Sequence, residues 1–264
     1  MLIQKLTEKQ TSIIQAGVLI SVLVLMERYS PIRQPREQKR QRIVRNLAIA
    51  GLGLVIQAIE KPLINRALSV TKKHNLGLLN QWRLPSYLRV SLGVMMLDYT
   101  LYWWHYLNHR SRFLWRFHEI HHADMDMDFS TANRFHFGEL FLSFFWRLSQ
   151  ITVLGIDHVS LSLWQNLLSY SILFHHSNLK LPALCEKFLQ PVIVTPNIHA
   201  IHHSKIKFDS NTNFSSGLSL WDRLHRTFRS PKPNENLIMG TADLQEVGDA
   251  ELAQMLSRPF KRRG

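Results

Sequence analysis

The chain has 264 residues, of which 45% are hydrophobic, and a formal net charge of +13. This length suits one large domain or two small ones. The basic charge admits nucleic-acid binding, but most of the early cations lie in a short link between two apolar stretches, so no nucleic-acid partner is expected. The single cysteine, Cys185, excludes an internal disulfide, a CxxC redox pair and an iron–sulfur cluster held by cysteines.

Five apolar stretches alternate with polar and charged segments along the chain. They are Ile13 to Met26, Leu47 to Ile59, Val90 to Trp104, Leu140 to Ile156 and Val159 to Phe174. With their flanks, each approaches the roughly 17 to 25 residues that a helix needs to cross a bilayer. Asp98 in the third stretch and Arg147 in the fourth count against a crossing. We predict an all-α, multi-pass transmembrane bundle of about four to five membrane helices.

The charge distribution predicts which side of the membrane each segment faces. Seven cations between Arg28 and Arg45 lie in the link between the first two stretches. The positive-inside rule assigns such a short basic link to the cytoplasm. The third stretch then ends on the cytoplasmic side at Trp104, and the fifth ends there at Phe174. An integral membrane location is therefore expected, with the polar segments that follow these stretches forming a cytoplasmic helical cap.

Histidines crowd these polar segments in three regularly spaced clusters. The clusters are His105 and His109 (HxxxH), His118, His121 and His122 (HxxHH), and His199, His202 and His203 (HxxHH). Spacings of three and four residues place side chains on one face of a helix. Imidazole is a ligand for iron, zinc, copper or nickel, and eight imidazoles exceed what one ion can use. The clusters predict a site for two metal ions.

Three kinds of metal protein compete for this pattern. His118, Glu119 and His122 satisfy HExxH, which favours an integral membrane zinc hydrolase, although a mononuclear zinc site would leave His121 and two clusters unused. A ferritin-like di-iron bundle needs several Glu-x-x-His pairs, and only Glu119 with His122 forms one. A non-catalytic metal-binding or transport protein would place its ligands at mid-bilayer depth, whereas these clusters lie beyond helix ends.

The order of the clusters resembles the fatty acid hydroxylase and sterol desaturase superfamily of integral membrane di-iron oxygenases. The resemblance spans about residues 90 to 228 and includes Asp98 to Trp104, Arg134 to His136, Phe174 to Asn178, Asp209 to Asn213 and Trp221-Asp222. It implies nine metal ligands: His105, His109, His118, His121, His122, His176, His199, His202 and His203. It leaves open whether His136 or His175 also binds metal.

Residues beside the ligands are expected to orient them. A metal-bound imidazole usually donates its other N–H to a carboxylate or carbonyl oxygen. Asp98 lies seven residues before His105, two turns along the same helix face, in an apolar run where an unpaired carboxylate is costly. The candidates in such supporting positions are Asp98, His136 and Asp222, with Asp124, Glu139 and Asp209 as further acids near the clusters.

The resemblance also implies a reaction and its partners. Dioxygen is reduced at two iron ions, for which zinc can substitute in a purified form, and a lipid C–H bond is hydroxylated or desaturated. The substrate, drawn from the bilayer, is left open among a sterol, a fatty acyl chain, an ether lipid and a carotenoid. Because no GxGxxG motif or cysteine cluster is found, electrons are expected from an external ferredoxin or a cytochrome b5-type carrier with its reductase.

The predicted organisation has three parts. Residues 1–88 hold N-terminal membrane helices and the basic cytoplasmic loop, residues 89–230 form the fatty acid hydroxylase-like di-iron domain, and residues 231–264 form a polar tail. Within the tail, Ala242 to Leu256 are expected to form an amphipathic helix. Near the end of the second part, Phe214-Ser215 replaces the family's tyrosine-glycine, and His225-Arg226 replaces its phenylalanine-glycine. These departures concern the substrate pocket and leave the ligands intact.

Overall fold

Helices form the regular structure of this computed structural model, which describes residues 2–231, 237–242 and 251–261. The α-helices are α1 (Leu2–Tyr29), α2 (Lys39–Lys73), α3 (Ser86–Arg110), α4 (Arg112–His122), α5 (Phe137–Leu154), α6 (His158–His176), α7 (Ala183–Leu189), α8 (Pro196–His202), α9 (Lys207–Ser210), α10 (Leu220–Leu224) and α11 (Leu252–Ser257). The described residues also form isolated β-bridges but no strand, which confirms the all-α prediction. The predicted tail helix lies partly outside the described residues.

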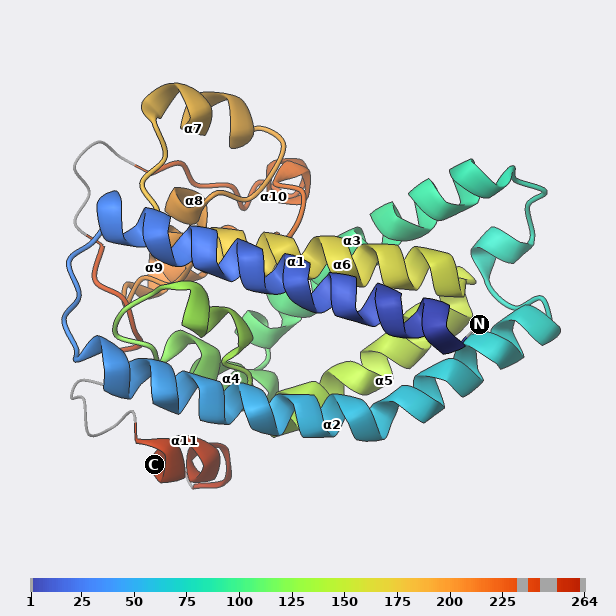
Figure 1. Ribbon diagram of the computed structural model, residues 1–264, viewed down its shortest axis with the longest axis horizontal. Coiled ribbons are helices and arrows are strands. Elements are labelled where there is room, and N and C mark those ends of the chain that lie inside the picture. Colours follow the sequence, from blue (N-terminus) through green and yellow to red (C-terminus); the bar gives the residue numbers. More distant parts are fainter. Residues whose placement is uncertain (1, 232–236, 243–250, 262–264) are drawn as a thin grey trace.

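The long helices form a bundle, and the short helices gather at one end of it (Figure 1). α1, α2, α3, α5 and α6 contain the five apolar stretches, and α2 packs on α5 while α3 packs on α6. α4 and α7 to α11 lie at the end where α1 finishes and α2 begins. At about 1.5 Å per residue, α5 and α6 are roughly 27 to 29 Å long, close to the apolar thickness of a bilayer.

A single helical stretch of the described chain, Lys39–Asn80, is long and apolar enough by itself to cross a membrane. Its most apolar window has a mean hydropathy of 1.6 and is 11% buried, so most of its side chains face outward. The other long helices coincide with predicted membrane segments but do not meet this criterion on their own. Ionisable residues such as Asp98 in α3 and Arg147 in α5 reduce their apolar character.

The apolar core lies between α2, α3, α5 and α6. Its buried members are Leu68, Leu79, Leu97, Ile151, Ile156, Leu161 and Trp164. α3 and α6 approach closely at Gly93, where an added Cβ would lie 2.8 Å from Oγ of Ser160. The packing of α3 on α6 brings their C-terminal ends close together, and both of these ends carry histidines.

Side-chain caps fix where the histidine-bearing helices begin. Oγ of Ser111 accepts a hydrogen bond from the backbone N–H of Leu114 at the start of α4. Thr195 caps α8 in the same way, and Pro196 occupies its first turn, where no backbone N–H is needed. These caps set the register of α4 and α8, and therefore the direction in which their histidines point.

A buried polar network holds the loop after α4 against the start of α2. Nη1 of Arg42 donates to Oδ2 of Asp124 at 3.0 Å, and Arg42 also pairs with Asp128. Asn46 donates to Oδ2 of Asp124 at 2.8 Å. All four side chains are buried, so each charge needs these partners. The basic link that was predicted to face the cytoplasm thus also supports the segment that follows His122.

Candidate metal site

Nine histidines from four helices converge at the end of the bundle where the short helices lie. His105 and His109 are on the last turns of α3, and His176 is the last residue of α6. α4 carries His118, His121 and His122, while α8 and the residue after it carry His199, His202 and His203. Except for His109, which is partly exposed, all of them are buried.

The nine side chains form two adjoining groups. Their members are His105, His109, His118, His122 and His202 in group one, and His121, His176, His199 and His203 in group two. Within each group, the possible ligand atoms all lie within 4.8 Å of one another. α4 and α8 contribute to both groups, because neighbouring positions on a short helix point in different directions. These are the nine residues that the cluster pattern and the family resemblance predicted as ligands.

Backbone carbonyls determine which ring nitrogen of the group-one histidines is free. Nδ1 of His105 donates to the carbonyl oxygen of Phe214 at 2.7 Å, and Nδ1 of His202 donates to that of Thr212 at 2.8 Å. Each neutral ring therefore presents the lone pair of Nε2 inward. The two Nε2 atoms are 2.9 Å apart. Two lone pairs at this distance repel each other unless a cation lies between them.

In group two, a backbone carbonyl fixes the tautomer of His176. Its Nδ1 donates to the carbonyl oxygen of Ile172 at 2.9 Å, so its Nε2 carries a lone pair. That Nε2 is 3.1 Å from Nε2 of His121 and 3.1 Å from Nε2 of His199. Nε2 of His203 is also 3.1 Å from Nε2 of His199. Four ring nitrogens thus lie close together.

These distances fit metal coordination. A metal–nitrogen bond of about 2.1 Å places two nitrogens at right angles roughly 3.0 Å apart. Nε2 of His109, His118 and His122 is buried and has no hydrogen-bond partner among the described residues, which suits a metal-ligand atom. Neutral imidazoles suit iron, zinc, copper and nickel. The donor set therefore fits two transition-metal ions side by side.

Burial keeps these imidazoles neutral. It lowers the pKa of His121, His122, His199 and His203 well below the usual value of 6.5, and neighbouring histidines lower it further. Burial also lowers the pKa of His202 to about 3. A protonated imidazole cannot bind a metal, so the site is prepared for cations at neutral pH.

A carboxylate orients one ligand directly. Nδ1 of His118 donates to Oε1 of Glu139 at 2.8 Å, and both side chains are buried. Glu139 lies in the first turn of α5, which is capped by His136: Nδ1 of His136 accepts from the backbone N–H of Gly138 at 2.9 Å. His136 therefore lies outside both histidine groups. It supports the helix that carries Glu139 and does not contact a predicted ligand.

The other two predicted supporting residues, Asp98 and Asp222, hold the segment around Phe214, between α9 and α10. Asp222 accepts from the backbone N–H groups of Phe214 at 2.8 Å and Ser215 at 2.9 Å. Burial raises the pKa of Asp222, and these hydrogen bonds oppose the rise. Because the Phe214 carbonyl accepts from His105, Asp222 positions that carbonyl. Asp98 accepts from Nε1 of Trp221 at 2.7 Å and fixes the same segment against α3.

Two residues that the sequence left open lie beside the groups. His175 is buried, and its ring centre is 4.0 Å from that of His199, but it belongs to neither group. The glutamate of the HExxH pattern, Glu119, is also buried. Nε of Arg258 donates to its Oε2 at 3.1 Å, so the carboxylate is ion-paired with the chain beyond α11. Glu119 has no place in either histidine group.

The backbone carbonyl acceptors could not be predicted from the sequence. Phe214, Thr212 and Ile172 orient ligands through backbone atoms, which any residue could supply. Asp222 was an indirect signal for the Phe214 carbonyl, because its hydrogen bonds to Phe214 and Ser215 shape the turn after Asn213. Asn213 itself has a φ of 55°, a left-handed conformation that asparagine tolerates better than most residues. Glu139 could be found from sequence only as one of several nearby acids.

Comparisons with known proteins find hydroxylases and monooxygenases. Ornithine lipid hydroxylase OlsE of Rhizobium tropici is 31% identical over 186 residues, 70% of this chain and 54% of that protein. Alkylglycerol monooxygenase of Homo sapiens is 27% identical over 149 residues, 56% of this chain and 31% of that protein. Cholesterol 25-hydroxylase-like protein 1, member 2 of Danio rerio is 28% identical over 152 residues, 55% of this chain and 53% of that protein.

The chain thus spans about half the length, or less, of these relatives. No solved structure matches it significantly. The family model for fatty acid hydroxylases matches residues 90–227, which is more than half of the chain and includes all nine grouped histidines. Its relatives are oxidoreductases by name, as the resemblance implied. By this match and by its histidine pattern, the chain belongs to the fatty acid hydroxylase family.

Proposed function

We propose that the chain is a membrane-bound di-iron oxygenase that uses dioxygen and external electrons to oxidise a C–H bond of a lipid. The observation that carries this proposal is the convergence of nine buried histidines in two adjoining groups. Two bound irons would supply the reduction of dioxygen and the attack on an unactivated carbon. The chain's own residues hold the ligands in place, keep them unprotonated and exclude water from the space between them.

In this proposal, the nine grouped histidines are the metal ligands, and three acids position them. Glu139 holds His118, while Asp222 and Asp98 hold the segment whose Phe214 carbonyl fixes His105. An imidazole that donates Nδ1–H to an oxygen is fixed in one tautomer, with Nε2 free for the metal. Residues 89–230 would therefore form the catalytic unit.

We also propose that α1, α2, α3, α5 and α6 form a multi-pass membrane domain with the histidine groups facing the cytoplasm. Large apolar side chains are exposed on these helices, including Leu54 on α2, Val153 on α5 and Val159 on α6 at 67%, 66% and 62%. Exposed apolar side chains along these helices suit lipid contact. The histidines lie where α3 and α6 end, so a lipid could reach them from the bilayer edge.

A lipid substrate is supported by the names of the relatives. These act, by name, on an ornithine lipid, an alkylglycerol and cholesterol. The three molecules share an apolar body and differ in their polar parts, so the proposal extends to lipids as a class. Hydroxylation is favoured over desaturation because hydroxylases and monooxygenases are the matching relatives.

The zinc hydrolase is the alternative enzyme, and the position of Glu119 disfavours it. A general base must reach the metal-bound water. Glu119 is instead paired with Arg258, and His118 and His122 belong to a group of five histidines. A metal transporter is disfavoured because the histidines gather at helix ends and in short helices beyond them.

External electrons would enter through a basic pocket beside group one. This pocket has a volume of about 530 Å³, and His109 and His122 form part of its wall. Its described lining contains four cations, Arg110, Arg112, Lys205 and Lys207, and one acid, Glu119. The ring of Trp115 lies 4.9 Å from that of His109 and 5.4 Å from that of His122. An acidic ferredoxin or a cytochrome b5-type carrier fits this charge.

Metal content of the purified protein tests the proposal. About two irons per chain would support it, and one zinc per chain would refute it in favour of the hydrolase. In group two, His121→Ala removes one of four ligands, so it should lower the iron content toward one per chain and abolish product formation. A zinc hydrolase would keep most of its zinc in this variant, because HExxH does not use His121.

Mass spectrometry of lipids from cells with and without the chain would then identify the oxidised product.

A further inference from the structure

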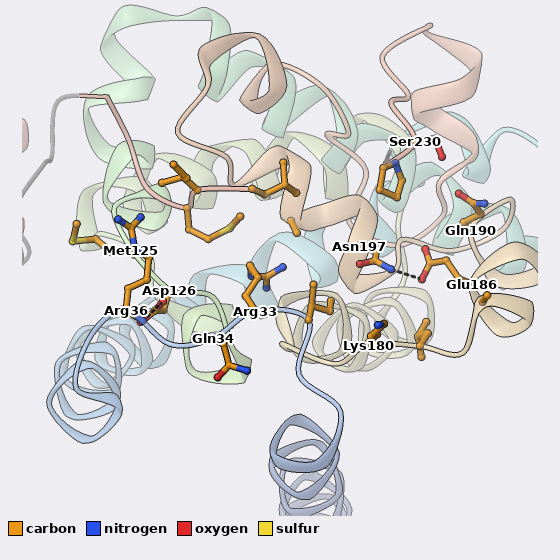
Figure 2. Close-up of a pocket in the computed structure, with 18 of the residues that line it drawn as sticks. Arg33, Gln34, Arg36, Met125, Asp126, Lys180, Glu186, Gln190, Asn197 and Ser230 are labelled. Carbon is orange, nitrogen blue, oxygen red and sulfur yellow. Dashed lines mark hydrogen bonds between the residues drawn. The ribbon is translucent and has the colours of Figure 1, made fainter. Parts of the chain in front are cut away.

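A second cavity has none of the grouped histidines in its lining, and Figure 2 shows residues that form its walls. Its volume is about 1020 Å³. The walls come from the α1–α2 link, the loop after α4, the region of α7 and the start of α8. The charged residues that line it are Arg33, Arg36, Asp126, Lys180, Glu186 and Lys187. Nothing in the proposed oxygenase chemistry uses this cavity.

Cations outnumber acids among the described residues of the cavity, and both acids are engaged. Asp126 accepts from the backbone N–H groups of Arg36 at 3.0 Å and Glu37 at 2.9 Å. Glu186 accepts from Oγ1 of Thr195 and, at 3.2 Å, from Nδ2 of Asn197, the contact drawn in Figure 2. The two carboxylates therefore serve to shape the walls, and the lining retains an excess of positive charge.

Arg33 is the clearest indication that the cavity binds a group that accepts hydrogen bonds. Its backbone is fixed, since its N–H donates to Oδ1 of Asn178 at 3.0 Å and its carbonyl accepts from Nδ2 of Asn178 at 2.8 Å. Nη2 donates weakly to the carbonyl of Met127 at 3.5 Å, while Nη1 is buried and has no partner among the described residues. A buried guanidinium N–H without an acceptor is unfavourable. Burial lowers the pKa of Arg33 only to about 10, so the group stays cationic at neutral pH.

The surroundings of the cavity favour a lipid as the source of the anion. The link that carries Arg33 and Arg36 joins α1 to α2, so in the proposed topology it lies at the cytoplasmic membrane surface. Beside the cavity, α7 and the chain after it expose Leu184, Phe188 and Val192 at 65%, 69% and 56%. Basic groups next to exposed apolar side chains suit an anionic headgroup whose acyl chains stay in the bilayer.

We propose that this cavity binds a phosphate group, supplied by the headgroup of an anionic phospholipid. The phosphate oxygens would accept from the partly buried Arg33, and the exposed Arg36 and Lys180 add positive charge to the lining. The proposal rests on the membrane orientation given under the proposed function and is independent of the metals and of the redox reaction. Its test therefore measures binding and needs no turnover.

The experiment uses the full chain in a neutral detergent, with three probes. These are phosphatidylglycerol, a diacylglycerol with the same acyl chains, and inorganic phosphate, each titrated while the thermal unfolding midpoint and native mass spectra are recorded. Phosphatidylglycerol should bind and raise the midpoint. Arg33→Gln with Arg36→Gln should weaken this binding about ten- to a hundredfold, because charge-assisted hydrogen bonds are lost. Lys180→Gln, at an exposed position, should weaken it by a smaller factor and serves if the double variant does not fold.

The matched control is Arg40→Gln, which removes an exposed cation of α2 that does not line the cavity and should change the affinity less than twofold. Equal binding of the diacylglycerol, or an equal loss in Arg40→Gln, would overturn the proposal. Inorganic phosphate that binds as tightly as phosphatidylglycerol would overturn the lipid source. Failure of the oxygenase proposal would appear instead as missing iron or missing product, with phosphatidylglycerol binding unchanged.

Discussion

Replacement of Glu139 tests how far one carboxylate sets the metal affinity of group one. Oε1 of Glu139 accepts from Nδ1 of His118 at 2.8 Å, in a pair with both side chains buried. Glu139→Gln keeps the shape and a carbonyl oxygen but removes the charge. A charge-assisted hydrogen bond contributes about 1.5 to 3 kcal/mol and a neutral one about 1 kcal/mol, so the change should cost about 0.5 to 2 kcal/mol. That corresponds to about 2- to 30-fold weaker binding of one metal ion.

Glu139→Ala goes further because it leaves the buried Nδ1–H of His118 without an acceptor. Loss of such a partner typically weakens metal binding about 10- to 100-fold. Competition with a chelator of known affinity measures both variants, and metal analysis after dialysis counts the ions retained. The expected order of affinity is wild type, then Glu139→Gln, then Glu139→Ala, with group two keeping its ion in all three.

Glu119→Gln is the matched control, because it changes a second buried glutamate, on α4 itself, that pairs with Arg258 and lies in neither group. It should lower stability while leaving two metal ions per chain and the affinity unchanged. Two results together would refute this reasoning. Glu139→Gln would bind metal as tightly as the wild type, and Glu119→Gln would keep its metal ions but lose enzymatic activity. That pair of results would assign Glu119 the role of a general base, as in the zinc hydrolase.

Three further outcomes are expected. Arg226 has a φ of 58°, where glycine is favoured, so Arg226→Gly should stabilise the fold by about 1 kcal/mol in denaturant unfolding with unchanged metal content. Asp222→Asn should cost about 2 kcal/mol in the same assay, because an amide cannot accept equally from Phe214 and Ser215, and a melt identical to wild type would contradict this. The metal-free protein should lose stability as the pH falls from about 6.5 toward 3. In this pH range His202 is protonated in the unfolded chain but not in the folded one, where its pKa is lowered to about 3. The free energy of unfolding should therefore fall by up to about 1.4 kcal/mol per pH unit for this residue. A thermal melting midpoint that does not change with pH would contradict this prediction.

The helical class and the histidine site could be predicted because both depend on local spacing. HxxHH repeats fix which side chains share a helix face, and long apolar stretches fix where helices form. His176 was reached only through the family resemblance, because one histidine at a helix end carries no spacing signal of its own. The number of membrane helices was predicted with less support, since among the described residues only the stretch from α2 meets the criterion by itself.

The sequence by itself determined which eight histidines could share helix faces, because three- and four-residue spacing is a property of the chain order. Only the tertiary structure decided how these eight and His176 divide into two groups. His118 and His122 join His105 from α3, while His121 joins His176 from α6. It also decided that Glu139 supports a ligand while Asp98 and Asp222 act through the Phe214 segment. Such contacts join residues far apart in the chain, so they depend on packing that local spacing does not encode.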